Sequence, residues 1–165
     1  MNADFVKTAL ERFERPLLEY ARRLMGDLDA ARDVVQETFI KLCRSEDAAI
    51  AEHLAEWLYT VCRHQAFDQG RKERAMKLRE RKLEPAVPEP TCAQSERRDE
   101  FDSALRHLEH LPEKQQEVIR LRFQGGLSYA EISRVTGDSV GNVGWLLHQA
   151  LKGLRERMLA KEVRA

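Results

Sequence analysis

The sequence predicts an all-α protein of two small helical domains joined by a flexible linker. Ala, Leu, Arg and Glu are abundant, and the 165 residues include only 8 Gly and 5 Pro, a composition that favours helices. Apolar residues recur at steps of three and four on both sides of a proline-rich segment that has no periodicity. These observations predict one domain at residues 1–80, a linker at 81–97 and a second domain at 98–165.

The first domain should contain three helices. The first, at about 4–25, has its apolar residues at helical spacing, and Pro16 is expected to break or kink it. The second, at about 29–44, combines a clean apolar stripe with a polar opposite face. The third, at about 53–77, follows the short acidic stretch SEDAAIAEH and ends in strongly basic turns.

The basic end of the third helix has a regular face. In CRHQAFDQGRKERAMKLRERK, Arg63, Phe67, Arg71 and Arg74 follow one another at steps of four, four and three. Cations with an interleaved aromatic ring are suited to backbone phosphates and an unstacked base. A solvated helix end that is rich in cations near the negative pole of the helix dipole has the same pattern. The residues alone therefore leave both interpretations open.

The linker, LEPAVPEPTCAQSERR, has three prolines in six residues and precedes the second set of helices. Helices are expected at about 97–110 and from Pro112 to the Gly125–Gly126 pair. Ser128 and Glu131 then form a capping box, in which the hydroxyl and the carboxylate each satisfy a free N–H at a helix start.

The C-terminal stretch has the outline of a helix-turn-helix motif. Ser133, Gly137 and Val143 supply a small residue where the helices cross, a glycine for the turn and a β-branched residue that packs the second helix back. Asp138 or Ser139 can cap that second helix. An ordinary αα-hairpin would tolerate the same pattern, so the motif by itself does not establish DNA binding.

The last helix, at about 140–160, should have one buried and one outward face. The expected buried stripe is Val140, Val143, Leu147, Ala150, Leu151, Leu154 and Met158. The expected outward face is Gly141, Asn142, Gly144, Trp145, His148, Gln149, Lys152 and Arg155.

The net charge of zero hides segments of opposite sign. Residues 61–82 contain eight Lys and Arg against three Asp and Glu, and residues 118–165 contain eight against four. Two basic segments suit an extended polyanion, and the acidic segments between them suit a basic protein partner. Solvated helix faces would give the same balance.

Several classes of protein are disfavoured. The N-terminal MNADFVKTALERFERP has no unbroken apolar run, so we expect no signal peptide or membrane span and a cytoplasmic protein. Cys43, Cys62 and Cys92 contain no C-x-x-C pair, which suits reduced thiols. A zinc site with His64 is disfavoured because Cys62 and His64, two apart, point to different sides of a helix. Without a phosphate loop, carboxylate pair or activated nucleophile, we expect no enzyme, metal or cofactor.

Three stretches, in this order, resemble the sigma-70 family of RNA polymerase sigma factors, specifically the small two-domain extracytoplasmic-function (ECF) type. RPLLEYARRLMGDLDAARDVVQETFIKL resembles regions 2.1 to 2.2, and EWLYTVCRHQAFDQGRKER resembles regions 2.3 to 2.4. ALRHLEHLPEKQQEVIRLRFQGGLSYAEISRVTGDSVGNVGWLLHQALKGLRERM resembles regions 4.1 and 4.2. The resemblance covers nearly the whole chain.

In the first domain the resemblance implies contacts with the polymerase and with the −10 promoter element. The residues that match the motif docking on the clamp helices of the largest catalytic subunit are Asp33, Gln36, Glu37 and Phe39. Phe39 lies on the apolar side of its helix and is expected in the core. The residues assigned to the −10 element, where the family melts the duplex and holds a flipped base, are Arg63, Phe67, Asp68, Arg71, Lys72 and Arg74.

Two residues of this domain keep a second interpretation. Trp57 lies in the stretch that matches the base-binding region, but its register with Leu58 and Val61 favours a core role. Asp68 is four residues from both His64 and Lys72, so it could organise that helix face without touching DNA.

In the second domain the resemblance implies that the helix-turn-helix enters the major groove of the −35 element, while the preceding helices hold the flap of the second-largest polymerase subunit. The chain has GNVGWLLHQA where many relatives have a string like GTVKSRLHRA, so Gly144, Leu146 and Gln149 stand at expected cation positions. Fewer cations should weaken the salt-dependent part of binding. The residues assigned to base edges and phosphates are Arg134, Asn142, Trp145, His148, Gln149, Lys152 and Arg155.

The resemblance implies a sigma factor that recruits core RNA polymerase to promoter DNA and helps to melt the start site. Its expected partners are core polymerase, promoter DNA and, as for many small sigma factors, an anti-sigma factor. Two alternatives remain at this point: a sigma-like decoy that titrates a partner, and a stand-alone helix-turn-helix regulator. The polar face around Asp33 and the basic face around Arg63 argue against the regulator, which has no need of a strand-opening domain.

Overall fold

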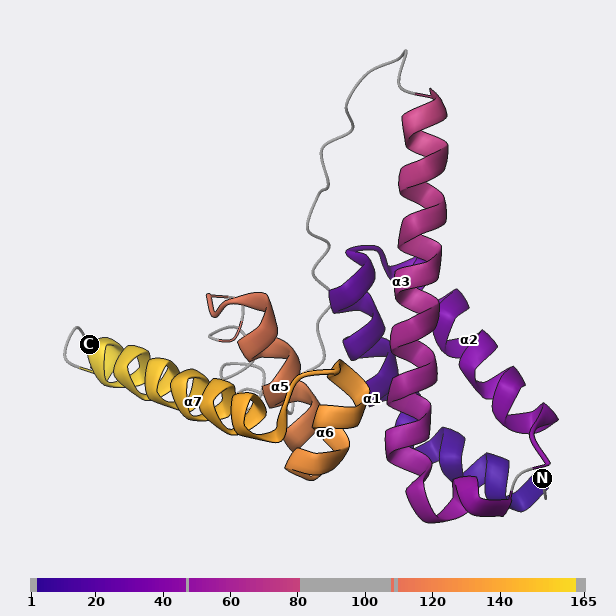
Figure 1. The fold of residues 1–165 in the computed structure, drawn as a ribbon, viewed down its shortest axis with the longest axis horizontal. Coiled ribbons are helices and arrows are strands. Elements are labelled where there is room, and N and C mark those ends of the chain that lie inside the picture. Colours follow the sequence, from indigo (N-terminus) through magenta and orange to yellow (C-terminus); the bar gives the residue numbers. More distant parts are fainter. Residues whose placement is uncertain (1–2, 47, 81–107, 109, 163–165) are drawn as a thin grey trace.

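The computed structural model describes residues 3–46, 48–80, 108 and 110–162, and within these ranges every regular element is a helix (Figure 1). In chain order the elements are α1 (Ala3–Met25), α2 (Leu28–Arg44), the 3₁₀ helix η1 (Ala48–His53), α3 (Leu54–Glu80), α5 (Glu113–Phe123), α6 (Tyr129–Thr136) and α7 (Val140–Glu162). The predicted all-α class is confirmed. Part of the acidic stretch before α3, predicted as irregular, forms η1.

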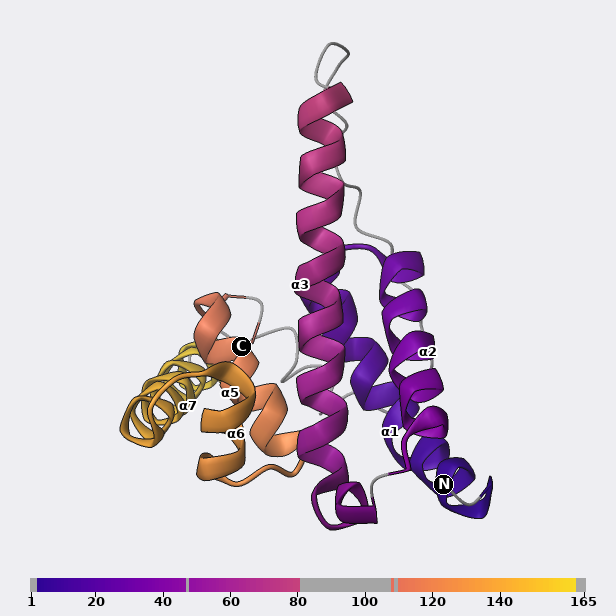
Figure 2. The ribbon, with the colours of Figure 1, turned by 45° about the vertical axis from the view of Figure 1, so that its right-hand side comes forward.

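The first three helices form a bundle in which α1 and α2 pack on each other and on the N-terminal half of α3. The C-terminal turns of α3 extend beyond this bundle (Figures 1 and 2). Each fully buried large side chain contributes about 1.5–3 kcal/mol through removal of apolar surface from water. The large side chains at the centre of the bundle are Leu17, Tyr20, Leu42, Leu58 and Tyr59.

Helix α1 continues through Pro16, so the break expected there is not present. Proline has no N–H, and the carbonyl of Arg12 therefore loses one helical hydrogen bond. Phe13 and Leu17, on either side of the proline, are both buried against the bundle. Their packing keeps the two parts of the helix together at the cost of that bond.

The boundary between α1 and α2 lies at the predicted place. Gly26 adopts a left-handed conformation with φ of 72°, which a side chain with a Cβ disfavours. Asp27 is the N-cap of α2, and its carboxylate accepts a hydrogen bond from Ala30 N at 2.8 Å. The glycine ends one helix and the aspartate begins the next.

Helices α5, α6 and α7 form a second bundle. The predicted capping box is present at the start of α6: Glu131 N donates to Ser128 Oγ at 3.3 Å, and Ser128 N donates to Glu131 Oε2 at 2.7 Å. These bonds hold α6 at a defined angle after the Gly125–Gly126 turn. The buried side chains of this bundle include Val118, Leu121, Leu127, Ile132, Val135, Val143 and Leu147.

The turn between α6 and α7 follows the helix-turn-helix prediction. Gly137 has φ of 80° and its N–H bonds to Ser133 O, which ends α6. Ser139 Oγ accepts from Asn142 N at 3.2 Å, so Ser139 caps α7. Asp138 instead accepts hydrogen bonds from the side chains of Lys114 and Asn142.

The buried stripe of α7 differs from the predicted one. Leu146, which stands at an expected cation position and was not in the predicted stripe, is only 6% exposed, whereas the expected core residues Val140, Leu151 and Met158 are about half exposed. Among the described residues, α7 packs chiefly on α5 and α6. The three apolar side chains therefore lie on parts of α7 that these two helices do not cover.

The two bundles pack against each other, chiefly through α3 and α6. In Figures 1 and 2, α5, α6 and α7 lie on one side of α3 and α2 lies on the other. Tyr20 Oη donates to Glu117 Oε1 at 2.8 Å, and Gln124 Nε2 donates to Glu19 Oε2 at 3.0 Å. Gly125 lies against the Tyr59 ring. The sequence did not predict this contact between the domains.

Some predictions fall outside the described part of the chain. They concern the linker at 81–97, most of the helix expected at 97–110, Cys92, and the side chain of Arg74. Leu108, which is described, is buried. No helix in the described ranges is long and apolar enough to cross a membrane.

Gly125 is a position where a single methyl group should destabilise the protein. A Cβ there would lie 2.5 Å from Leu127 Cδ1, 2.7 Å from Leu121 O and 2.8 Å from Tyr59 Cε2. The backbone oxygen cannot move aside cheaply, so Gly125→Ala should lower the free energy of unfolding by about 1–3 kcal/mol. Urea unfolding followed by far-UV circular dichroism measures the change.

Gly141→Ala is the matched control for Gly125→Ala. A Cβ at Gly141 meets nothing within 4 Å, and alanine is the better residue inside a helix. We expect an unchanged or higher stability, by up to about 1 kcal/mol. Equal losses in the two variants would show that the crowding at Gly125 is not the cause.

The capping box should give part of the stability a defined pH dependence. Hydrogen bonds from the Ser128 hydroxyl and N–H lower the pKa of Glu131 in the folded chain. Its stabilising contribution is therefore complete above the unfolded pKa of about 4.3 and is lost as the pH falls through the lower folded value. Ser128→Ala should cost about 1 kcal/mol at neutral pH, and this difference should shrink at acidic pH.

The control for the capping box is Glu131→Gln, which keeps a side-chain acceptor but has no charge to titrate. Urea unfolding across the acidic range should show less pH dependence in Glu131→Gln than in the wild type. A Ser128→Ala loss that stays constant down to strongly acidic pH would contradict the assignment.

Candidate functional site

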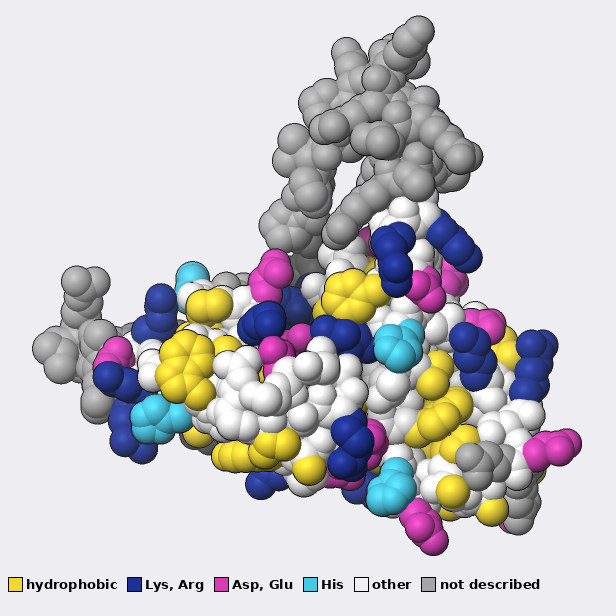
Figure 3. Space-filling view, in the orientation of Figure 1, with side chains coloured by type: hydrophobic (Ala, Val, Ile, Leu, Met, Phe, Trp, Pro, Cys, Tyr) yellow, Lys and Arg dark blue, Asp and Glu magenta, His cyan; other side chains and the backbone are white. Residues whose placement is uncertain are grey.

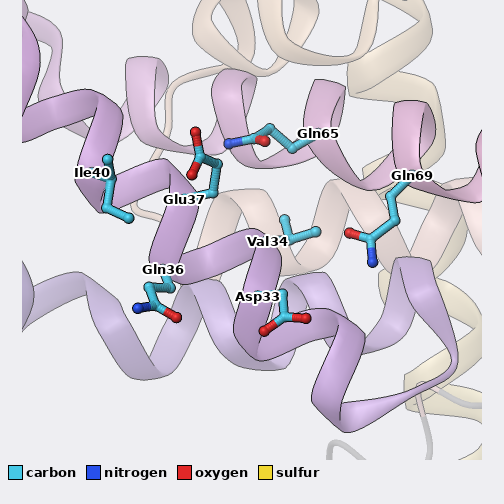
Figure 4. Close-up of a pocket in the computed structure, with 7 residues that line it drawn as sticks. All are labelled: Asp33, Val34, Gln36, Glu37, Ile40, Gln65 and Gln69. Carbon is cyan, nitrogen blue, oxygen red and sulfur yellow. The ribbon is translucent and has the colours of Figure 1, made fainter.

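A polar hollow lies between α2 and α3. Asp33, Gln36 and Glu37 project from α2 on one side of it, and Gln65 and Gln69 project from α3 on the other (Figure 4). Asp33 and Gln36 are exposed, and Glu37 is half-buried. The spacing of three and four residues on α2 brings the predicted polar side chains to one face, as the sequence indicated.

The side chains of this hollow lack internal partners. No described residue forms a hydrogen bond or ion pair with the side chain of Asp33, Gln36 or Glu37, and the buried Gln65 Nε2 has no acceptor within the described ranges. Unpartnered carboxylates beside an unpartnered amide can receive charged or polar groups of another molecule. Phe39 is instead 6% exposed, in the core position expected from its helical register.

Gln65 and Gln69 were missed by sequence reasoning. A signal for them existed, because they are four residues apart and about half a turn away from Arg63 and Phe67 on the same helix. Two amides on the face opposite a cationic one indicate a second surface of α3. The packing of α2 shows that this surface shares a hollow with Asp33 and Glu37.

The basic face of α3 carries the predicted cation and aromatic ring together. Arg63 Cζ lies 4.6 Å above the Phe67 ring centroid, and Phe67 is 44% exposed. Arg71 and Lys72 are exposed on the next turn. Asp68 pairs with Arg71, with Arg71 Nη2 donating to Asp68 Oδ1 at 2.8 Å, so its partner is neither His64 nor Lys72.

Arg63 is the most enclosed of these cations. Its side chain is 20% exposed, and Nε donates to Glu117 Oε1 at 2.9 Å. Burial alone would lower the pKa of Arg63, but the hydrogen bond and negative charge of Glu117 outweigh burial, so the pKa is raised. Burial, followed by the neighbouring Glu117, also raises the pKa of Tyr20 well above its usual value. Glu117 therefore faces a permanent cation and a neutral phenol.

The outward face of α7 has aromatic and basic residues in one stripe. Trp145 is 57% exposed, and His148, Lys152 and Arg155 are exposed along the same side. Gln149 and Asn142 are half-buried, and Asn142 Nδ2 donates to Asp138 Oδ1 at 3.0 Å. Figure 3 shows hydrophobic, basic and histidine side chains exposed over this part of the molecule. The face can offer stacking and hydrogen bonds with modest positive charge.

One of the expected cation positions has a structural explanation. A Cβ at Gly144 would make only an ordinary contact with Tyr129, 3.6 Å from Cε2, so packing does not require glycine there. Leu146 is buried and could not carry an outward cation without leaving the core. Arg122, which sequence reasoning missed, has its Cζ 5.6 Å from the Tyr129 ring centroid. It contributes a cation from α5 next to the recognition face.

Arg134 on α6 is held by the first domain. Its Nε donates to Glu56 Oε1 at 2.6 Å and its Nη2 to Glu56 Oε2 at 2.7 Å, a two-pronged contact. Hydrogen bonding to Glu56 raises the pKa of Arg134. Arg134, which the sequence assigned to a phosphate contact, is therefore paired with the Glu56 carboxylate in this structure.

Among the described residues, the side chains that could ligate a metal are not the cysteines and His64 considered in the sequence analysis. His53, Glu56 and Glu131 have ligand atoms within 4.8 Å of one another. However, both oxygens of Glu56 accept from Arg134, and Glu131 Oε2 accepts from Ser128 N. Cys43 is exposed and Cys62 is buried, and burial raises the pKa of the Cys62 thiol to about 12, so Cys62 behaves as a core residue.

Each of the two bundles matches a known protein family. The family described as Sigma-70 region 2 matches residues 9–76, and that described as Sigma-70, region 4 matches residues 101–154. The ECF RNA polymerase sigma factor SigL of Mycobacterium tuberculosis is 31% identical over 147 residues, which cover 84% of this chain and 80% of SigL. The chain belongs to the ECF sigma factors.

Two other sigma factors match almost the full length of this chain. RNA polymerase sigma factor YlaC of Bacillus subtilis is 27% identical over 161 residues, with 94% of this chain and 92% of YlaC covered. The sigma factor RpoE, solved in complex with the anti-sigma factor NepR from Bartonella quintana, has a TM-score of 0.62 and 26% identity over 94% of this chain and 96% of RpoE. As a sigma factor, the chain binds core RNA polymerase and directs promoter-specific initiation. The resemblance seen in the sequence is confirmed.

Proposed function

We propose that the polar hollow between α2 and α3 is where this sigma factor docks on core polymerase. The observation that carries this proposal is the set of unpartnered polar groups there: Asp33, Gln36 and Glu37 on one wall and Gln65 on the other. Their charge suits a basic or hydrogen-bonding helix, which corresponds to the clamp helices of the largest subunit. Phe39 supports this face from the core. The flap of the second-largest subunit would be held by the second domain.

The basic face of α3 is proposed to meet the −10 element. Phe67 exposes a ring on which an unstacked base can lie, and Arg63, Arg71 and Lys72 surround it with positive charge. Asp68 has a structural role, because it neutralises and orients Arg71. Arg74 keeps its predicted role on the continuation of the helix.

The exposed face of α7 is proposed to read the −35 element. Trp145 and His148 offer stacking and hydrogen bonds to bases, and Lys152 and Arg155 offer phosphate contacts. Gln149 is half-buried beside them, and its amide suits an adenine edge. Asn142 can contribute its amide oxygen, since its nitrogen is bonded to Asp138. Arg122 and Arg134 add cations from the neighbouring helices.

The remaining parts of the proposal follow from the sigma-factor role. The domains responsible are residues 1–80 and 98–165, which act on DNA in the cytoplasm. The chain supplies no chemistry of its own, because polymerisation belongs to the core enzyme. The NepR complex of the Bartonella relative makes an anti-sigma factor a reasonable partner here.

In vitro transcription with core polymerase on a genomic library tests the docking face. The wild-type chain should produce specific start sites, and Asp33→Lys with Glu37→Lys should abolish both the transcripts and co-purification with the core. Glu11→Lys with Glu14→Lys reverses two exposed carboxylates on α1 that have no partner among the described residues; this variant is the matched control and should remain active. Normal co-purification of the Asp33 and Glu37 variant would refute the docking assignment.

Salt dependence of DNA binding tests the α7 face. Lys152→Ala with Arg155→Ala should weaken binding to all sequences and reduce the slope of log K against log salt by about 2, since each phosphate contact releases counterions. Trp145→Ala should leave the slope unchanged and reduce the preference for the −35 sequence. Fluorescence anisotropy with specific and random duplexes separates the two effects. An unchanged slope in the double variant would remove Lys152 and Arg155 from the contact.

A further inference from the structure

The contact between the two domains is made largely by residues that the proposed function needs for DNA. Arg63, from the −10 face, bonds to Glu117 of the second domain, and Arg134, from the −35 domain, bonds to Glu56 of the first. Each arginine thus receives its carboxylate from the opposite domain. Figure 3 shows basic and acidic side chains side by side along this junction.

Glu117 covers the Arg63 guanidinium on the face of α3 where DNA is proposed to bind. Glu117 and Arg63 are 15% and 20% exposed, and Tyr20 Oη donates to the same Glu117 oxygen at 2.8 Å. A phosphate or base cannot reach this guanidinium while α5 covers it, and the negative charge of Glu117 would repel a phosphate placed nearby. DNA contact through Arg63 therefore requires α5 to move away.

The Arg134 contact imitates a phosphate contact. Glu56 takes two N–H groups of the guanidinium at 2.6 and 2.7 Å, in the fork geometry by which arginine binds carboxylate or phosphate. Glu56 is 16% exposed on the side of the first domain. It stays with that domain when the two separate, so separation frees Arg134.

The contact combines polar pairs with apolar packing, since the buried apolar residues of both bundles form one cluster. Besides the ion pairs it contains the Gln124–Glu19 hydrogen bond and the approach of Gly125 and Leu127 to Tyr59. The polar pairs are the part that other charged partners can replace, because a hydrogen bond that can be exchanged for one to water contributes little net free energy. Helix α2 lies on the other side of α3 from α6 (Figure 2), and the proposed docking hollow is lined by residues of α2 and α3, so polymerase docking there does not compete with closure.

We infer that Glu117 and Glu56 form a two-point latch that closes the free sigma factor and withholds Arg63 and Arg134 from promoter DNA. The inference rests on the proposed roles of these arginines. The apparent affinity for DNA then equals that of the open form multiplied by the open fraction, so a chain closed nine-tenths of the time binds about tenfold more weakly than an open one. Separation of the domains would release both cations together.

The test opens the latch without touching either arginine. Glu56→Gln with Glu117→Gln removes both negative charges at constant shape, and the full-length variant should show a larger radius of gyration in small-angle X-ray scattering. Its affinity for a labelled random-sequence duplex should rise by about tenfold in the absence of polymerase. Glu11→Gln with Glu14→Gln changes the net charge equally outside the contact and should change neither quantity.

The outcomes separate the latch from the proposed function. Unchanged scattering of the latch variant, or a larger radius without tighter DNA binding, would overturn the inference even if transcription with core polymerase stays normal. Glu56→Gln alone affects a pair whose arginine is exposed, so it supplies a variant that should still fold and should show an intermediate opening. Failure of the wild-type chain to initiate with core polymerase would instead contradict the proposed function, and scattering would still decide on closure.

Discussion

The arrangement of the molecule depends on one carboxylate between the two bundles. Glu117, on α5, accepts hydrogen bonds from Tyr20 of α1 and Arg63 of α3. A carboxylate that is largely removed from water is tolerated when charged and polar donors surround it. This requirement ties three helices together at one point and explains why a residue near the start of the second domain determines how α5 lies on the first.

The two sides of α3 have different tasks. One side, with Gln65 and Gln69, faces α2 and shares its polar hollow, and the other, with Arg63 and Phe67, faces the second domain and the proposed −10 DNA. Because the two faces lie on opposite sides of one helix, the proposed polymerase contact and the proposed DNA contact do not overlap.

Packing explains one of the cations that α7 lacks. Leu146 belongs to the core, whereas a side chain at Gly144 would make only an ordinary contact with the Tyr129 ring. What remains on the outer face of α7 is an exposed indole, an imidazole and two cations near the middle and end of the helix. If α7 reads the −35 element as proposed, we expect base stacking, hydrogen bonds and duplex shape to carry the discrimination. Arg122, placed against Tyr129 from α5, partly restores the lost charge.

The sequence by itself determined the helices, their caps and the helix faces that are formed by residues three or four apart. Local rules suffice for these features: Asp27, Ser128 and Gly137 act on neighbouring backbone groups, and Asp33 and Glu37 share a face because they are four residues apart. Tertiary structure alone decided which cations are free. Arg63 and Arg134 meet carboxylates 54 and 78 residues away, and no periodicity encodes such pairs. The same holds for Leu146 and Val140, since burial along α7 depends on which helices cross it.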